Sequence, residues 1–319
     1  MKRLLLILLI LLSFVNCESK KEIKPEVLAI PISFQVDRFD KKFADAKPSD
    51  LKRLKEEYPY LFPNRFPDEF WVEKIQDTIQ QEINTEVAKV FPDFKEEGDE
   101  LTLLFKHVKY YFPEFVSPKV ITVTSEVDYR NKVIISDSLM LIALDTYLGE
   151  DHFFYEGISN YISKNLKKEQ LVPDVAGTYA RQLLGPNAKR EFVAQMIYYG
   201  KMLYLIEQFA PFVPAYNVIG YTEDEYNWSV ANEAEIWRYF IEKKLLFSTD
   251  TKLPGRFLNP APFSKFYLEL DNESPGMLGR YIGWKIVQSY MENNDVSLQE
   301  LISKDEVKLF QEAKYKPNK

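Results

Sequence analysis

The spacing of apolar residues along the chain predicts a mostly helical protein. Within residues 68–91, Ile75, Ile79 and Ile83 recur every four positions, which is typical of the apolar face of an amphipathic helix. The same kind of pattern predicts helices over residues 48–58, 101–112, 153–165, 168–184, 188–209, 223–245 and 275–292. The last helix has a start signal in the serine–proline pair at 274–275, because serine caps helices and proline suits the first helical position.

β-Branched residues in the first half of the chain predict a small sheet. The runs VITVT (120–124) and VII (133–135) flank a polar segment, DYRN, and this arrangement indicates an antiparallel hairpin. Residues 139–144 are predicted as a third strand, and residues 30–39 are strand-like. No long linker follows, so we predict one α+β domain over 30–319, mostly helical, around a small antiparallel sheet packed by helices.

Residues 1–16 have the pattern of an export signal that ends at a cysteine. Two basic residues precede an apolar run over 4–15, which is too short for a comfortable membrane-spanning helix. Cys17 is the single cysteine of the chain and follows this run. The arrangement predicts a lipoprotein, cleaved before Cys17 and anchored by diacylglycerol and palmitate on it, with a lipidated tether over 17–29. The alternative is an ordinary signal peptide with an incidental cysteine.

The composition narrows the possible function classes. The 319 residues carry 41 basic and 48 acidic side chains, so the chain lacks the basic surplus of nucleic-acid-binding proteins. One cysteine excludes an internal disulfide, and the two histidines, His107 and His152, lie too far apart for an HExxH zinc motif. P-loop, GxGxxG and GxSxG motifs are also absent. We therefore predict no cofactor, no metal and no catalytic residue.

Glu233 and Glu235 are the acidic pair that a hydrolase could use as acid and base. They lie two positions apart in a predicted helix and therefore point to different faces. Capping and solvated-face roles account for most such carboxylates, so the sequence favours a structural interpretation.

Gly276, Gly279 and Gly283 are spaced three and four positions apart, which places them along one face of the predicted helix over 275–292. A face without side chains lets a second backbone approach closely. The sequence therefore favours tight helix packing at these glycines over a ligand site.

A series of segments in a fixed order carries a resemblance to a known family. The segments are RFD (38–40), YPYLFP (58–63), DYRNKVI (128–134), ALDTYLGEDHFFY (143–155), YYGKMLYLIE (198–207), GYTEDEYNWSVANEAEIWRYF (220–240), NPAPFSKFYLELDNESPGMLGRYIGWKIVQSYM (259–291) and KYKP (314–317). Together with the leader, they resemble the gliding-motility lipoprotein GldB family of Bacteroidota. APFSKF and ESPGMLGRYIGWKIV are quite specific. The resemblance implies a role in the cell envelope, in gliding and beside the type IX secretion system.

That family is also distantly similar to zinc peptidases that carry HExxH. The similarity implies a degenerate, zincin-like scaffold in which the metal-binding motif is lost. It aligns the helix over 189–209 with the motif helix, and places Gly200, Lys201 and Tyr204 where the motif residues would stand. The helix over 232–240 would correspond to the third-ligand helix. A glycine, a lysine and a tyrosine cannot hold zinc in this way, so the similarity implies a scaffold used for binding.

Three functions remain open. The first is a non-catalytic lipoprotein that supports gliding and type IX secretion by contacting other envelope proteins. The second is a periplasmic hydrolase acting on peptide or peptidoglycan, with Glu233 and Glu235 as the first residues to test. The third is a cell-wall or glycan-binding module, since aromatic residues make up 15% of the chain. The mixed charges behind Cys17 fit no surface-export pattern, so we expect a periplasm-facing protein on either membrane.

Overall fold

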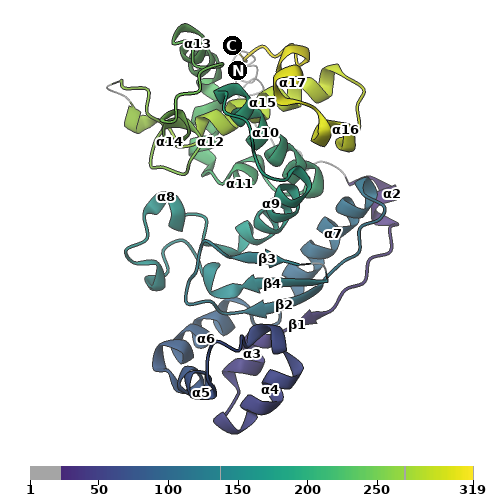
Figure 1. Ribbon diagram of the computed structural model, residues 1–319, viewed down its shortest axis with the longest axis vertical. Coiled ribbons are helices and arrows are strands. Elements are labelled where there is room, and N and C mark those ends of the chain that lie inside the picture. Colours follow the sequence, from purple (N-terminus) through teal and green to yellow (C-terminus); the bar gives the residue numbers. More distant parts are fainter. Residues whose placement is uncertain (1–22, 137, 269–270, 319) are drawn as a thin grey trace, which may run out of the picture.

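The computed structural model describes residues 23–136, 138–268 and 271–318. Figure 1 shows helices above and below a small sheet, with α3 to α6 on the lower side and α9 to α17 on the upper side. The strands are β1 (Val36–Asp37), β2 (Lys119–Val123), β3 (Val133–Ile135) and β4 (Leu139–Ala143). None of the helices in the described ranges is both long and apolar enough to span a membrane.

The helices confirm that the chain is mostly helical. The longer ones are α5 (Asp68–Gln76), α6 (Thr78–Val90), α7 (Lys95–Tyr111), α9 (Leu171–Leu184), α10 (Phe192–Phe209), α12 (Glu223–Ala231), α13 (Glu233–Glu242) and α15 (Leu278–Asn293). The shorter ones are α2 (Pro25–Leu28), α3 (Phe39–Ala44), α4 (Leu51–Glu57), α8 (Asn160–Ser163), α11 (Ala215–Ile219), α14 (Leu253–Phe257), α16 (Leu298–Ser303) and α17 (Glu306–Glu312).

The sheet is mixed, and the prediction of a wholly antiparallel sheet was wrong. Its strand order is β1-β2-β4-β3, in which β2 pairs in parallel with both β1 and β4, and only β3 runs antiparallel to β4. The predicted hairpin of β2 with β3 does not form, because β4 lies between them. The three central residues of β2 are buried and suit an inner position, whereas β3 exposes Ile134 and takes the edge.

The side chains of β2 and β4 alternate between two hydrophobic cores. Val120 and Met140 belong to the larger core, which also contains residues of α9, α10 and α15. Ile121 belongs to a smaller core with Phe39 of α3 and Leu54 of α4. Neighbouring residues in a strand point to opposite faces, so the sheet holds the two cores apart.

Two long predicted helices are each broken in the structure. The predicted helix over 68–91 is interrupted at Asp77, whose carboxylate accepts hydrogen bonds from the backbone N–H groups of Ile79 and Gln80 at 2.6 and 3.0 Å. Asp77 thereby caps α6, and α5 ends one residue earlier. The predicted helix over 223–245 likewise divides at Asn232 into α12 and α13.

Other helix boundaries also differ from the prediction. The predicted helix over 153–165 shortens to the four residues of α8 and a preceding turn. α15 begins at Leu278 rather than at 275, and the Leu278 N–H donates to the Ser264 hydroxyl at 3.2 Å, while the Ser274 hydroxyl donates to the Asp271 carbonyl oxygen. Toward the N-terminus, α2 lies within the segment predicted as tether and buries Val27, so ordered structure begins before residue 30.

The helices α10 and α15 cross at two glycines and form the centre of the upper layer. A Cβ atom on Gly283 would lie 1.9 Å from the carbonyl oxygen of Met196, and one on Gly200 would lie 2.2 Å from the carbonyl oxygen of Gly283. Gly279 and Gly276 similarly face the backbone at Phe257 and Ala261. The predicted packing role is therefore confirmed for Gly279 and Gly283, whereas Gly276 precedes α15 and packs against the loop at Ala261.

Candidate functional site

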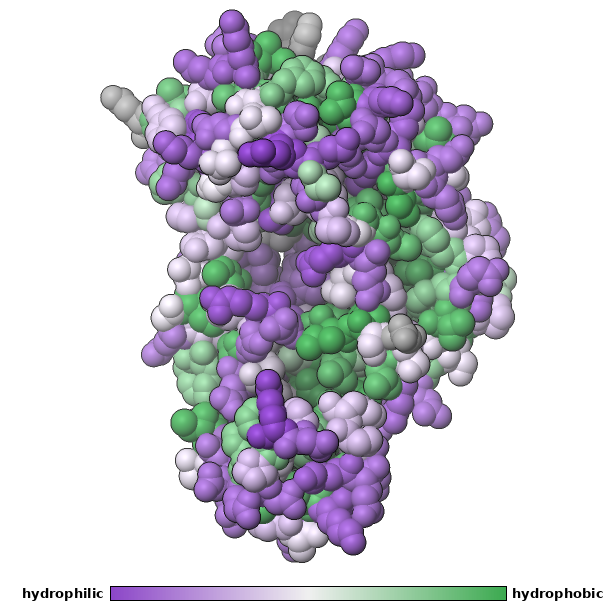
Figure 2. All heavy atoms as spheres, viewed as in Figure 1, coloured by the Kyte–Doolittle hydropathy of each residue, from purple (hydrophilic) through white to green (hydrophobic). Residues whose placement is uncertain are grey.

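A central cleft lies between α8 and the upper helices, beside the sheet. Figure 2 shows the surface hollowed there, with hydrophilic residues around the opening. One cavity of about 250 Å³ lies in this cleft, bordered by α8, α9, α10, α11 and the first turn of α15. A second cavity of about 710 Å³ adjoins it, and Tyr161 of α8 lines both. Several segments far apart in sequence meet here, which makes the cleft the candidate functional site.

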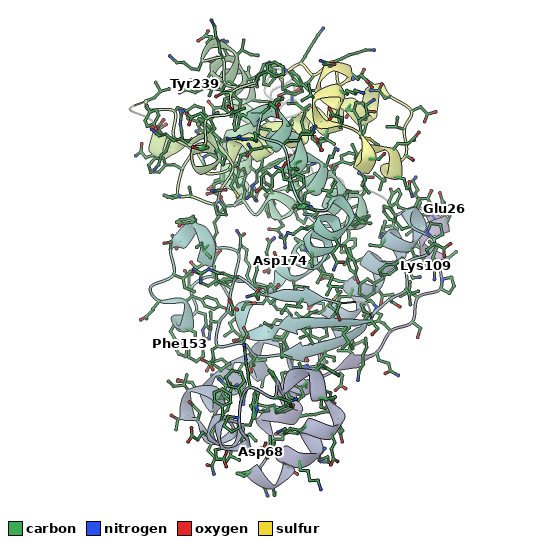
Figure 3. All side chains as sticks on the ribbon, viewed as in Figure 1. Glu26, Asp68, Lys109, Phe153, Asp174 and Tyr239 are labelled. Carbon is green, nitrogen blue, oxygen red and sulfur yellow. The ribbon has the colours of Figure 1, made fainter. Side chains whose placement is uncertain are left out.

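Asp174 lies in the first turn of α9 at the wall of the smaller cavity, and Figure 3 labels it between the sheet and the upper helices. Its carboxylate forms an ion pair with Lys132 and accepts a hydrogen bond from the Tyr147 hydroxyl at 3.0 Å. Burial, and secondarily the charge of Asp174, raise the pKa of Tyr147 well above its usual value. Tyr147 therefore remains a protonated donor, and Asp174 is held by two partners.

A second ion pair lies at the wall of the larger cavity. The ammonium group of Lys164 pairs with Glu225, whose carboxylate also accepts from the Thr222 backbone N–H at 2.8 Å. Thr222 and Glu225 form the capping box of α12, so the ion pair is fixed to a helix terminus. The lysine thereby joins the α8 side of the cleft to the upper layer.

Arg181 and Arg280 line the smaller cavity from the ends of two different helices. Arg181 lies in the last turn of α9 and is exposed, while Arg280 lies in the first turn of α15 and is partly buried. Within the described ranges, neither guanidinium forms an ion pair. Burial lowers the pKa of Arg280, and the nearby charge of Arg181 lowers this pKa as well. The two cations are thus close enough to repel each other.

Glu233 and Glu235, the acidic pair noted in the sequence, do not come together. Glu233 is buried, whereas Glu235 is exposed and pairs with Arg238 at 2.7 Å. The Glu233 carboxylate accepts hydrogen bonds from Tyr281 and Tyr315 hydroxyls, both at 2.9 Å, and from the backbone and side-chain N–H groups of Asn318. Glu233 therefore fixes the C-terminal segment to α13 and α15, and neither carboxylate lines the central cleft.

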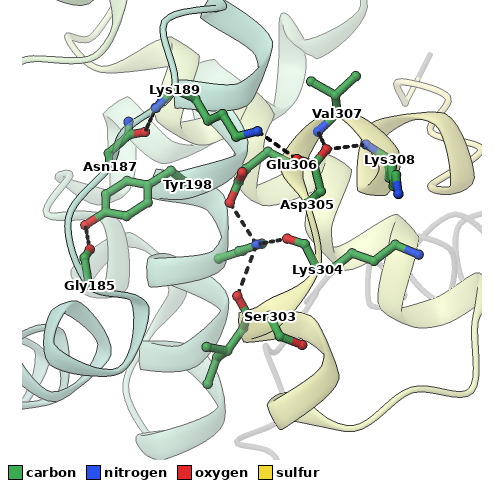
Figure 4. A network of polar contacts seen from close by, with 12 residues as sticks. Gly185, Asn187, Lys189, Tyr198, Ser303, Lys304, Asp305, Glu306, Val307 and Lys308 are labelled. Carbon is green, nitrogen blue, oxygen red and sulfur yellow. Dashed lines mark hydrogen bonds and ion pairs between the residues drawn. The ribbon is translucent and has the colours of Figure 1, made fainter.

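Gly200, Lys201 and Tyr204 do not line either cavity of the cleft. Gly200 faces α15, and Lys201 is 1% exposed. The Lys201 ammonium group pairs with Glu306 at 2.9 Å and donates to the carbonyl oxygens of Ile302 and Lys304. In Figure 4, dashed lines join the Glu306 carboxylate and the Lys304 carbonyl to one unlabelled nitrogen, and these two contacts identify it as the Lys201 ammonium group. The three positions that the peptidase similarity singled out thus lie in the packing around α10.

We expect replacement of Lys201 by methionine to lower the free energy of unfolding by about 2 kcal/mol. The substitution leaves Glu306, whose side chain is 16% exposed, and the carbonyl oxygens of Ile302 and Lys304 without their cation. Urea denaturation measures the effect. Lys189→Met is the matched control, since Lys189 is exposed and its partner Asp305 is also open to solvent, and we expect no measurable change there. Equal stability of the two variants would refute a structural role for Lys201.

The histidines and the cysteine give no metal site within the described residues. His107 is buried and its Nδ1 lies 2.8 Å from the Leu103 carbonyl oxygen, while His152 lies 3.4 Å from Glu86. Across residues 23–136, 138–268 and 271–318, no three histidine, cysteine or carboxylate side chains gather as a ligand set. Cys17 and the leader over 1–16 lie outside the described residues.

The sequence did not predict that the residues of the cleft form a site, because they are dispersed over about 150 positions. Lys132 and Arg280 do lie within DYRNKVI and ESPGMLGRYIGWKIV, two segments that carried the family resemblance. Asp174 and Arg181 lie outside all the segments that carried the family resemblance. Only the tertiary fold, in which α9 and α15 lie at the same cleft, brings Lys132, Asp174, Arg181 and Arg280 to one cavity. The family-like segments were thus a partial signal for the site.

The fold and the cleft define a mostly helical α+β protein with a central, ion-paired cavity. The family model described as gliding motility protein GldB matches residues 20–317. The chain therefore belongs to the gliding motility protein GldB family, as the resemblance predicted, and this membership associates it with gliding motility and the cell envelope. No curated protein and no solved structure matches the chain.

Proposed function

We propose that this protein is a non-catalytic, lipid-anchored envelope component that supports gliding motility and the linked type IX secretion machinery by contacting other proteins. The observation that carries the proposal is the family match, which extends over residues 20–317 and so includes every element around the cleft. The anchor is Cys17, and the folded domain faces the periplasm. The tether behind the cysteine holds the domain close to the bilayer.

The charges in the cleft support binding rather than catalysis. A general base must be able to reach a substrate proton, but Asp174 and Glu225 are both held by lysines and by further donors. Glu233 was one of the two catalytic candidates in the sequence. Its carboxylate accepts hydrogen bonds from four donors and lies away from the cleft. These two carboxylates fix the shape of the cleft. Glu150 and Asp151 also line the larger cavity, where both are exposed, and Glu150 pairs with Lys167 at 3.1 Å.

Replacing Cys17 by alanine is expected to abolish function in cells while leaving the folded domain intact. The substitution removes the only attachment point for lipid, and each acyl methylene contributes about 0.8 kcal/mol to membrane binding. The measurement is a conditional depletion complemented with wild type or with Cys17→Ala. Surface spreading and the secreted protein profile are scored together, with immunoblots of membrane and soluble fractions.

We expect wild-type complementation to restore both readouts. We expect the Cys17→Ala protein to be found in the soluble fraction and to restore neither. Unchanged spreading and secretion after depletion would contradict the proposed role. Restoration of both readouts by the unanchored variant would contradict the requirement for the anchor. Removal of the protein by protease treatment of intact cells would contradict the periplasmic orientation.

A further inference from the structure

Two kinds of cation line the central cleft, and they differ in their partners. Lys132 and Lys164 each form an ion pair with a carboxylate, Asp174 and Glu225 respectively. In the described part of the chain, Arg181 and Arg280 have no such carboxylate, although the protein carries a net charge of −7 and acidic residues are plentiful. The cavity of about 250 Å³ therefore has three cations and one carboxylate in its lining, and the excess positive charge lies at the arginines.

The guanidinium of Arg280 is held in a fixed orientation. Its Nε donates to the Leu258 carbonyl oxygen at 2.5 Å, and its plane lies over the ring of Tyr199, with 4.1 Å between the guanidinium carbon and the ring centroid. Its two terminal nitrogens have no hydrogen-bond acceptor among the described residues. A guanidinium with a free edge presents parallel N–H donors that match the two oxygens of a carboxylate.

A separate observation comes from Gln170, which also lines the cavity. Gln170 is 5% exposed, and its side-chain Nε2 donates to the Asn217 carbonyl oxygen at 3.1 Å. Its side-chain carbonyl oxygen has no donor among the described residues. A buried carbonyl without a donor is costly, and a ligand N–H would supply the missing hydrogen bond.

The remaining wall of the cavity is apolar. It is formed by Met202, Leu203 and Ile206 of α10 and by Val218 and Ile219 of α11. The cavity thus combines two oxyanion-binding cations, one acceptor for an N–H group and a surface for an aliphatic side chain. A free phosphate would use only the first of these features, whereas the carboxyl end of a peptide would use all three.

We propose that the cavity between Arg181 and Arg280 binds the terminal carboxylate of a peptide chain. The carboxylate lies between the two guanidinium groups, the amide N–H of the last residue donates to Gln170, and its side chain contacts the wall formed by α10 and α11. This assignment rests on the proposed function, because it describes the contact through which a non-catalytic envelope protein would hold a partner.

The test uses the full-length protein in detergent and isothermal titration calorimetry. The probes are acetyl-trialanine with a free carboxylate, the same peptide with a C-terminal amide, and inorganic phosphate. We expect the free carboxylate to bind about tenfold more tightly than the amide, and more tightly than phosphate. Arg181→Gln is expected to weaken carboxylate binding about tenfold and to remove the preference over the amide.

Arg181 is exposed and forms no ion pair with the described residues, so its replacement should not disturb folding, and thermal unfolding of the variant verifies this. Arg53→Gln is the matched control, since Arg53 is an exposed arginine of α4 with its own carboxylate partners and should leave affinity unchanged. Equal affinity for the two peptides, tighter binding of phosphate, no binding of any probe, or unchanged affinity in Arg181→Gln would each overturn the assignment.

The calorimetric result is independent of the depletion experiment. If no peptide binds but complementation restores gliding and secretion, the proposed carboxylate site is contradicted and the proposed role in gliding is not. If the peptide binds but depletion has no effect on cells, the proposed role in gliding is contradicted instead. Mass spectrometry of the peptides after titration adds a third readout, because cleaved products would contradict a non-catalytic protein.

Discussion

Replacing Gly283 by alanine is expected to lower the free energy of unfolding by about 3 kcal/mol or more. The new Cβ would lie 1.9 Å from the Met196 carbonyl oxygen and 2.5 Å from its carbon, and both atoms belong to the backbone of α10. A backbone cannot rotate away as a flexible side chain can, so the two helices must separate. Because α10 and α15 form the centre of the upper layer, we expect the loss to spread through the larger core.

Gly98→Ala is the matched control for this substitution. Gly98 lies within α7, and in the described part of the chain no atom beyond the neighbouring backbone of its own helix lies within 4 Å of an added Cβ. Alanine is favoured over glycine in a helix by about 1 kcal/mol, so this variant should be as stable as the wild type or more stable. Urea denaturation of both variants measures the difference. A Gly283→Ala protein with wild-type stability would show that α10 and α15 do not cross at this glycine.

The glycine face illustrates what the sequence could predict about the fold. Spacing within one helix is a local property, and it correctly indicated close packing at Gly279 and Gly283, whereas Gly276 lies before the first residue of α15. The neighbours of Gly283 are Met196 and Gly200 of α10, and Gly200, which lies 83 positions before Gly283, has no local pattern that identifies it. The glycine spacing therefore predicted that another backbone approaches this helix closely. Only the tertiary fold shows which segment that is.

The errors in the fold have similar physical causes. The apolar spacing through 68–91 continues across Asp77, but it does not mark one buried face: Ile75 of α5 and Ile83 of α6 are buried, whereas Ile79, beside the capping carboxylate, is 61% exposed. Strand order was missed because sequence adjacency favours a hairpin, whereas the burial of β2 and β4 on both faces favours placing them side by side. The Asp145 carboxylate then holds the turn after β2, accepting from the Ser125 and Val127 N–H groups.

The second large effect is expected for Glu233→Gln, with a loss of about 2–4 kcal/mol in the free energy of unfolding. The Glu233 carboxylate accepts from the hydroxyls of Tyr281 and Tyr315 and from Asn318. Burial, and then the charge of Glu233, raise the pKa of both tyrosines, so both hydroxyls remain protonated donors. The amide NH₂ of glutamine would face these donors with a further donor and could satisfy only part of the set.

Glu235→Gln serves as the control, since its side chain is 63% exposed and its pair with Arg238 is a surface contact. We expect a change within about 0.5 kcal/mol. Urea denaturation of the two variants separates the structural interpretation from the catalytic one, because the hydrolase hypothesis treated the two carboxylates as equivalent candidates. Equal stability of Glu233→Gln and wild type would mean that this carboxylate does not hold the C-terminal segment. Glu233 would then again be a candidate catalytic residue of the hydrolase hypothesis.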